Sequence, residues 1–291
     1  MNASVVDVLL PLALAFIMFA LGLTLTAGDF VRVAKRPQAM AVGLAGQVLL
    51  VPLVGYLVAT AWGLPPEMAA GLMIVAACPG GASSGLITHL ARGDTALSIS
   101  LTAVTSVAAV LTMPLVIDFS LRHFTGAGVA GELPVGRMVR GVFFLTTVPV
   151  GTGMLLKRYR AALTARIAKG TERIATALFL VIVLATFASQ RQAIADNLGA
   201  IGPAALTHNL AVMALGFGVA AAAGLALRDR IAISVECGLH NAAVGIFIAV
   251  TVLQSPHLAV ASVVYALFMN LSAIALIFAM RRQGGKACAT G

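Results

Sequence analysis

One acidic residue, Glu236, lies in the middle of an apolar run that is long enough to cross a lipid bilayer. The stretch ECGLHNAAVG at 236–245 follows IAISV and precedes IFIAVTVL. A charged side chain at the bilayer centre costs roughly 2.5–3.5 kcal/mol even on a lenient scale, so such residues face a cavity, form a pair or bind an ion. We expect Glu236 to bind a cation. The alternative is a protonated carboxyl group that is hydrogen-bonded between helices.

Hydroxyl groups recur at a spacing that suits a cation site. Ser98 and Thr102 are four residues apart, so they share one face of a predicted helix. Ser83 and Ser84 follow the sequence PGG. Hard cations prefer carboxylate, hydroxyl and carbonyl oxygens, although Ser and Thr are also ordinary packing residues in membrane helices. Together with Glu236, the pattern predicts an oxygen-rich cation site.

Two apolar segments contain residues that break helices. Pro79, Gly80 and Gly81 are consecutive in AACPGGASSG, and Gly238 lies near the middle of the second segment. Proline removes a backbone donor and glycine weakens a helix. Unwound backbone is tolerated in a membrane only where it is buried in protein or lines a water-filled cavity. The sequence therefore predicts two interrupted spans that meet at a polar chamber.

The same breaks provide a place for an anion. A new helix N-terminus is expected after PGG and another around His240 and Asn241, where free N–H groups and the helix dipole favour negative charge. Lys and Arg occur in the predicted spans only near their ends. An anionic substrate would then be held by these dipoles and by Asn241, with its apolar body against Met, Phe and Leu side chains.

The composition is that of an integral membrane protein. Of 291 residues, 60% are hydrophobic and 10% are charged, and the mean hydropathy is +1.02. The net charge of +9 could suggest nucleic-acid binding, but the Lys and Arg residues lie at the ends of apolar segments, where topology and contacts with membrane lipid explain them. No nucleic acid partner is expected. The three cysteines do not form a disulfide framework.

Hydropathy predicts an all-α membrane protein with nine transmembrane helices. A basic-loop count places fifteen of the nineteen Lys and Arg residues on the inner side, with the N-terminus outside and the C-terminus cytoplasmic. The third and eighth spans, which carry the breaks, are five apart and so run in opposite directions. This favours inverted repeats of four and five spans, as in transporters. The spans are predicted near 4–27, 38–62, 67–91, 95–119, 137–156, 171–189, 202–227, 231–253 and 258–280.

These motifs resemble the bile acid:sodium symporter family. The resemblance is carried by CPGGASSGLITHLARGDTALSISLTAVTSVAAVLTMPL, ECGLHNAAVG and MFALGLTLTAGDF, and it covers essentially the whole chain. It implies a bacterial inner-membrane protein in which residues 1–291 form a single transporter unit. Two crossing pairs of broken helices would lie in a core domain, at about 38–120 and 171–253. A separate panel domain would comprise about 4–27, 137–156 and 258–280.

The resemblance also implies two sodium sites and a substrate site. The first sodium site would comprise Ser84, Gly85, Ser98, Thr102 and Glu236. The second would comprise Gln47, Glu236, the carbonyls of Cys237 and Leu239, and His240. The substrate-binding residues would be Ala82, Ser83, His240 and Asn241.

Two positions depart from the family pattern. Gly85 replaces an Asn and removes one side-chain oxygen. His240 replaces a Gln and presents nitrogen where a hard cation prefers oxygen. His240 beside Glu236 also resembles a proton relay, because imidazole titrates near physiological pH.

The resulting expectation is a secondary-active symporter that couples an organic anion, bile-acid-like or a small carboxylate, to Na⁺ by alternating access. The alternatives are proton coupling, a non-transporting sensor, and metalloid efflux as in the related arsenite carriers, which would use Cys78 or Cys237. An enzyme is not expected, since no HExxH spacing for a metal site occurs and no nucleophile motif stands out. The substrate and the oligomeric state stay open.

Overall fold

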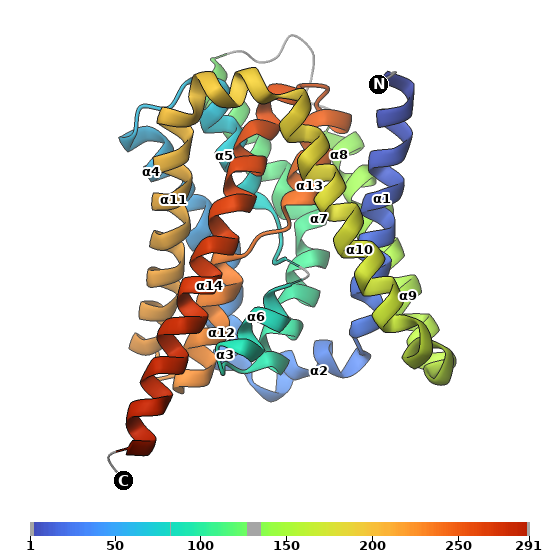
Figure 1. The fold of residues 1–291 in the computed structure, drawn as a ribbon, viewed down its shortest axis with the longest axis vertical. Helices are drawn as coiled ribbons and strands as arrows, with labels where there is room; N and C mark the ends of the chain where they lie inside the picture. Colours follow the sequence, from blue (N-terminus) through green and yellow to red (C-terminus); the bar gives the residue numbers. More distant parts are fainter. Residues whose placement is uncertain (1–2, 82, 127–134, 290–291) are drawn as a thin grey trace.

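The computed structural model describes residues 3–81, 83–126 and 135–289, and within them the chain is helical with no β-strand (Figure 1). Three helices contain a π-helical turn, labelled η1 to η3, and a short 3₁₀ turn, η4, precedes the last helix. The elements are α1 (Ala3–Thr24), α2 (Ala27–Lys35), α3 (Pro37–Ala45), η1 (Gly46–Leu50), α4 (Val51–Ala61), α5 (Pro66–Ala77), α6 (Ser84–Leu90), α7 (Thr95–Thr125), α8 (Val135–Val142), η2 (Phe143–Thr147), α9 (Val148–Tyr159), α10 (Ala161–Ser189), α11 (Arg191–Ala222), α12 (Leu227–Gly238), α13 (Ala242–Phe247), η3 (Ile248–Val252), η4 (Pro256–Leu258) and α14 (Ala259–Ala289).

Six helices among the described residues are long and apolar enough to cross a membrane, and three shorter helices are also apolar. This confirms an all-helical membrane protein, while the count of nine spans stays a prediction. The six are Pro37–Ala61, Thr95–Thr125, Met138–Tyr159, Ala161–Ser189, Arg191–Ala222 and Pro256–Met280, and the shorter three are Leu9–Thr24, Pro66–Ala77 and Ala242–Val252.

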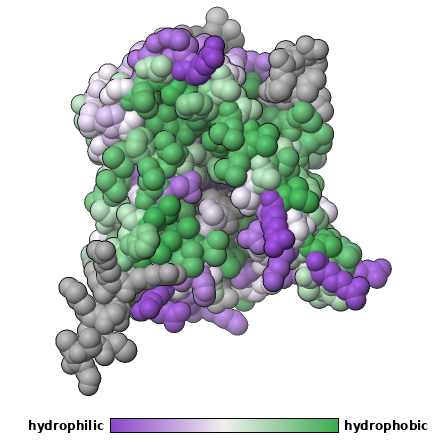
Figure 2. Space-filling model, viewed as in Figure 1, coloured by the Kyte–Doolittle hydropathy of each residue, from purple (hydrophilic) through white to green (hydrophobic). Residues whose placement is uncertain are grey.

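The surface fits a surrounding bilayer. Figure 2 shows hydrophobic side chains over most of the middle of one face and hydrophilic ones mainly towards its two ends, with a few beside a hollow near its centre. Large apolar side chains are exposed on several helices, among them Leu53, Leu115, Leu184 and Leu267. Such exposure would be costly in water but is favourable against lipid tails.

Two helices begin earlier than the hydropathy pattern predicts. The segments 157–170 and 190–200 were expected to be connections, but α10 begins at Ala161 and α11 at Arg191. The first segment is rich in Ala, Arg and Lys and the second in Ala and Gln, and these residues favour helix outside the bilayer as well. Hydropathy marks the apolar part of a helix and not its hydrogen-bonded limits. Figure 1 shows the first turns of α11 lying across the upper end of the bundle, and Pro203 lies inside this helix.

The helices pack in two groups that contact each other. Helix α1 packs against α9 and α10, on the right of Figure 1, whereas α14 packs against α11 and α5. Helix α7 packs against α5, α6 and α12, which carry the predicted chemistry. The predicted panel and core domains, with 258–280 in the panel and 171–189 in the core, stay a prediction.

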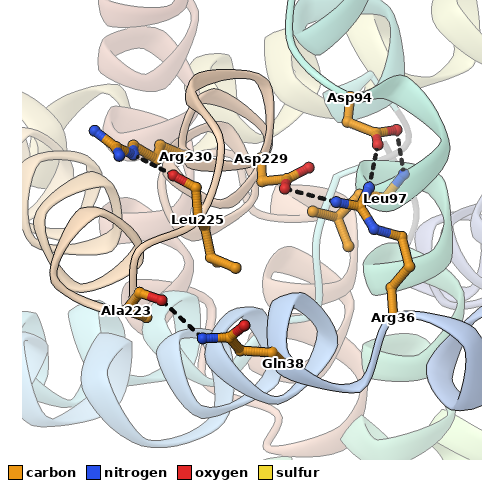
Figure 3. A network of polar contacts seen from close by, with 8 residues as sticks. All are labelled: Arg36, Gln38, Asp94, Leu97, Ala223, Leu225, Asp229 and Arg230. Atoms are coloured by element: carbon orange, nitrogen blue, oxygen red, sulfur yellow. Dashed lines mark hydrogen bonds and ion pairs between the residues drawn. The ribbon is translucent and has the colours of Figure 1, made fainter.

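A half-buried arginine joins three helices at one end of this assembly (Figure 3). The guanidinium of Arg36, just before α3, contacts Asp94 at 2.6 Å and Asp229 at 2.7 Å. Asp94 also caps α7 by accepting from the backbone N–H of Leu97, and Asp229 lies in the first turn of α12. The network therefore fixes the ends of α7 and α12 relative to α3.

We predict that Arg36→Gln lowers the free energy of unfolding by about 1–3 kcal/mol, because it leaves the carboxylate of Asp229, only 4% exposed, without a cation. Thermal unfolding of the purified protein in detergent measures the change. The matched control is Arg122→Gln, whose partner Asp118 lies one turn away in an exposed pair, and at most about 0.5 kcal/mol is expected there. Equal losses in the two variants would contradict the role given to Arg36.

Candidate functional site

The two predicted interruptions are confirmed, and each has a local cause. Helix α5 ends at Ala77, and Cys78 adopts extended backbone because the following Pro79 disfavours helix at the preceding residue. Helix α12 ends at Gly238, and Leu239 is extended. Asn241 then caps α13, its side chain accepting from the N–H of Val244 at 3.4 Å.

The two unwound segments form backbone hydrogen bonds with each other. Gly81 donates its N–H to the carbonyl of Leu239 at 2.8 Å, and Asn241 donates to the carbonyl of Pro79 at 2.9 Å. The bridge between Gly80 and His240 is antiparallel, as expected for spans that run in opposite directions. Buried backbone without helical bonds is thereby supplied with partners inside the protein, which a membrane requires.

The carboxylate of Glu236 lies beside this bridge among hydroxyl groups. It is 1% exposed, and it accepts from Thr102 at 2.6 Å and from Ser98 at 3.1 Å. Ser84 contacts the hydroxyl of Thr102 at 3.0 Å. Helices α6, α7 and α12 thus bring together four of the five residues that the resemblance implied for the first sodium site. This cluster of Ser84, Ser98, Thr102 and Glu236 is called the hydroxyl cluster below.

Gly80 makes room for that carboxylate. A Cβ atom at Gly80 would lie 1.8 Å from the Oε1 atom of Glu236 and 3.2 Å from the hydroxyl of Thr102. Any side chain here would push the carboxylate out of its hydrogen bonds. The glycine that breaks the helix is therefore also needed for close packing against the acid.

A second polar group surrounds the amide of Gln47 and is centred on nitrogen. The Nε2 atom of Gln47 donates to the carbonyl of Cys78 at 3.0 Å and lies 3.1 Å from Nδ1 of His240. Gln47 belongs to η1, a π-helical turn just before Pro52, whose missing N–H cannot continue the α-helical pattern. The residues of the predicted second site are thus partly gathered, but around an amide N–H₂ group.

Three further residues complete the second group, and no local sequence pattern indicates them. His208 stacks on the ring of His240 at 6.3 Å, and Tyr265 packs against both rings. Tyr265 and Asn209 donate to the carbonyl of Gly238 at 2.9 and 2.7 Å. They replace the helical partner that this carbonyl loses at the end of α12.

The cavity beside the breaks is small. It measures about 10 Å³, which is room for about one water molecule, and its lining includes Gln47, Cys78, Pro79 and Thr105. The expected polar chamber around Glu236 is instead a packed cluster of hydroxyl groups. The acid is held by direct hydrogen bonds because the two unwound segments pair tightly across it.

The other predicted residues lie at the margins of these groups. Gly85 is half-buried in α6, and a Cβ there would meet Ile99 at 3.1 Å. The thiol of Cys237 lies near Gly46 and Gly216. Ser83 is exposed. Ala82 falls outside the residues that the structure describes.

The chemistry of the hydroxyl cluster suits a hard monovalent cation. A carboxylate supplies the negative charge and three hydroxyl groups supply neutral oxygens, with water nearly excluded. The hydroxyl hydrogens that now point at the carboxylate can rotate so that their lone pairs face an ion. A Na⁺ ion fits this donor set.

Comparison with known proteins agrees with this chemistry. A model of the sodium bile acid symporter family matches residues 11–197. The chain is 30% identical to YocS of Bacillus subtilis (strain 168), described as an uncharacterized sodium-dependent transporter, over 89% of this chain and 78% of that protein. It is 29% identical to BASS2 of Oryza sativa subsp. japonica, a probable chloroplastic sodium/metabolite cotransporter, over 95% of this chain.

A third relative is the ileal sodium/bile acid cotransporter of Homo sapiens, which is 28% identical over 81% of this chain and 67% of that protein. The match covers 64% of the rice BASS2 protein, so this chain spans less than two thirds of that relative's length.

We predict that Gly80→Ala displaces the carboxylate of Glu236 and costs about 1–3 kcal/mol of stability, because buried hydrogen bonds are lost. Thermal unfolding in detergent measures the change. Gly199→Ala is the control, since a Cβ there meets nothing within 4 Å and alanine favours helix by up to about 1 kcal/mol. A neutral Gly80→Ala would show that Gly80 is not needed to seat the acid.

Proposed function

This chain belongs to the sodium bile acid symporter family, and from that membership we propose that it is a secondary-active symporter that moves an organic anion together with Na⁺ by alternating access. The names of these three relatives all specify sodium. We therefore place sodium coupling before proton coupling.

The hydroxyl cluster is the observation that carries this proposal. Among the described residues, no cation contacts the buried carboxylate of Glu236. An unpaired buried carboxylate is costly, and a bound Na⁺ would supply the missing charge. Glu236, Ser98 and Thr102 would then bind the ion directly. Occupancy of the cluster would strengthen the contact between α7 and α12, which gives Na⁺ a means of favouring one conformation.

The donors near the breaks support an anionic substrate. Among the residues that the structure describes, the buried Nε2 atom of His240 has no hydrogen-bond partner, and the amide nitrogen of Asn241 donates only to the sulfur of Met18, at 3.7 Å. We propose that these groups, with Ala82 and Ser83, bind the anionic part of the substrate. A bile-acid-like molecule and a small carboxylate both fit this chemistry.

Transport requires that the site open to each side in turn. We propose that the panel domain moves against the core domain while the paired breaks stay together, since their backbone bonds would otherwise be left unsatisfied. We also propose a bacterial inner membrane, with the N-terminus outside and the C-terminus in the cytoplasm, from the distribution of Lys and Arg.

The first test is a ligand panel. Thermal stabilisation of the purified protein is measured with one conjugated bile acid and a series of small mono- and dicarboxylates, in NaCl and in choline chloride. We expect at least one anion to stabilise the protein in NaCl and much less in choline chloride. Stabilisation that depends on pH but not on Na⁺ would favour proton coupling instead.

We further predict that Glu236→Gln lowers Na⁺-driven uptake of that anion into proteoliposomes by at least about tenfold, because the neutral amide cannot balance the charge of Na⁺. Glu67→Gln is the control, since Glu67 is an exposed carboxylate in the first turn of α5, and it is expected to keep wild-type uptake. Undiminished Na⁺-driven uptake by Glu236→Gln would rule out this site.

A further inference from the structure

The amide of Gln47 has a fixed orientation. Its Nε2 atom lies 3.0 Å from the carbonyl oxygen of Cys78 and 3.1 Å from Nδ1 of His240. Were the amide turned over, its oxygen would face the carbonyl oxygen of Cys78 at hydrogen-bond distance, and two acceptors would repel each other. The N–H₂ group must therefore point at both neighbours.

This orientation settles the state of His240. An amide N–H₂ group only donates, so a hydrogen bond between Gln47 and His240 requires that Nδ1 of His240 accept. The neutral ring then carries its hydrogen on Nε2, which has no hydrogen-bond partner in the described part of the chain and lies in the layer with His208 and Tyr265. The lone pair of Nδ1 is thus already engaged by a donor.

The contact between Gln47 and His240 is unfavourable for a cation. A Na⁺ ion between Gln47 and His240 would face two N–H bonds and an imidazole nitrogen, whereas it prefers oxygen. The carbonyls of Cys78 and Leu239 already accept from Gln47 and Gly81. Oε1 of Gln47 has no partner among the described residues, but it is a single oxygen, so the residues expected to form the second sodium site do not offer a sodium ion the set of oxygen donors that it prefers.

The hydroxyl cluster differs in each of these respects. Its donors are O–H groups that can rotate, its acceptors are oxygen atoms, and it contains the negative charge. We propose that this chain binds a single Na⁺, at the hydroxyl cluster, and that the Gln47–His240 hydrogen bond takes the place of a second ion. The inference rests on the proposed function and adds the number of coupling ions.

A count of bound ions tests the inference without any knowledge of the substrate. Saturation binding of ²²Na⁺ to the purified protein, at constant ionic strength with choline chloride, is expected to reach one ion per chain with a Hill coefficient of about one. Two ions per chain would overturn the inference and leave the sodium-coupled function standing. No bound sodium would overturn the proposed function itself.

A gain-of-site variant assigns the effect to His240. His240→Gln supplies an amide oxygen, and we expect binding to rise from one ion to two. His123→Gln is the control, because His123 is exposed near the end of α7 beside Tyr56 and away from the breaks, and binding is expected to stay at one. A stable His240→Gln protein that still binds one ion would contradict the assignment, and if this variant does not fold the wild-type count decides.

Transport provides an independent readout. One Na⁺ moving with one monovalent anion carries no net charge, so a diffusion potential of about 100 mV should leave uptake unchanged, whereas two Na⁺ would shift accumulation by roughly 50-fold. Potential-sensitive uptake of a monovalent anion by the wild-type protein would contradict the single-ion account.

Discussion

The architecture depends on the burial of one carboxylate at a point where two helices have lost their backbone bonds. Glu236 can lie there because Ser98 and Thr102 donate to it and Gly80 leaves space for it. The unwound segments can lie there because Gly81 and Asn241 donate across the break. The burial of Glu236 and the pairing of the unwound segments depend on each other, since the backbone bridge brings Gly80 against the acid. A change at either one is therefore expected to disturb both.

This arrangement separates two kinds of polar environment within one crossing. On one side, oxygen atoms surround a negative charge, which suits a hard cation. On the other, the amide of Gln47 and the imidazoles of His240 and His208 form a nitrogen-rich layer closed by Tyr265. The first environment can attract a cation, and the second presents N–H groups that suit an anion or a neutral partner. An anion and a cation could thus be bound close together without sharing ligands.

Part of this site was predictable from local sequence. Pro79 and Gly238 break helices by backbone chemistry alone, and the four-residue spacing of Ser98 and Thr102 places both hydroxyls on one face. The roles of Tyr265, Asn209 and Arg36 depend on tertiary packing. A Tyr or Asn in an apolar helix resembles ordinary packing, and Arg36 resembles any basic residue at a membrane boundary. The hydrogen bond between Gln47 and His240 joins residues 193 positions apart, so no local pattern indicates it.

The most direct measurement is a pair of experimental structures, one determined in Na⁺ and one in choline. The account predicts ion density in the Na⁺ structure between the carboxylate of Glu236 and the hydroxyl oxygens of Ser98 and Thr102, and none between Gln47 and His240. Hydroxyl groups that still donate to the carboxylate in saturating Na⁺, with no ion among them, would contradict the central claim.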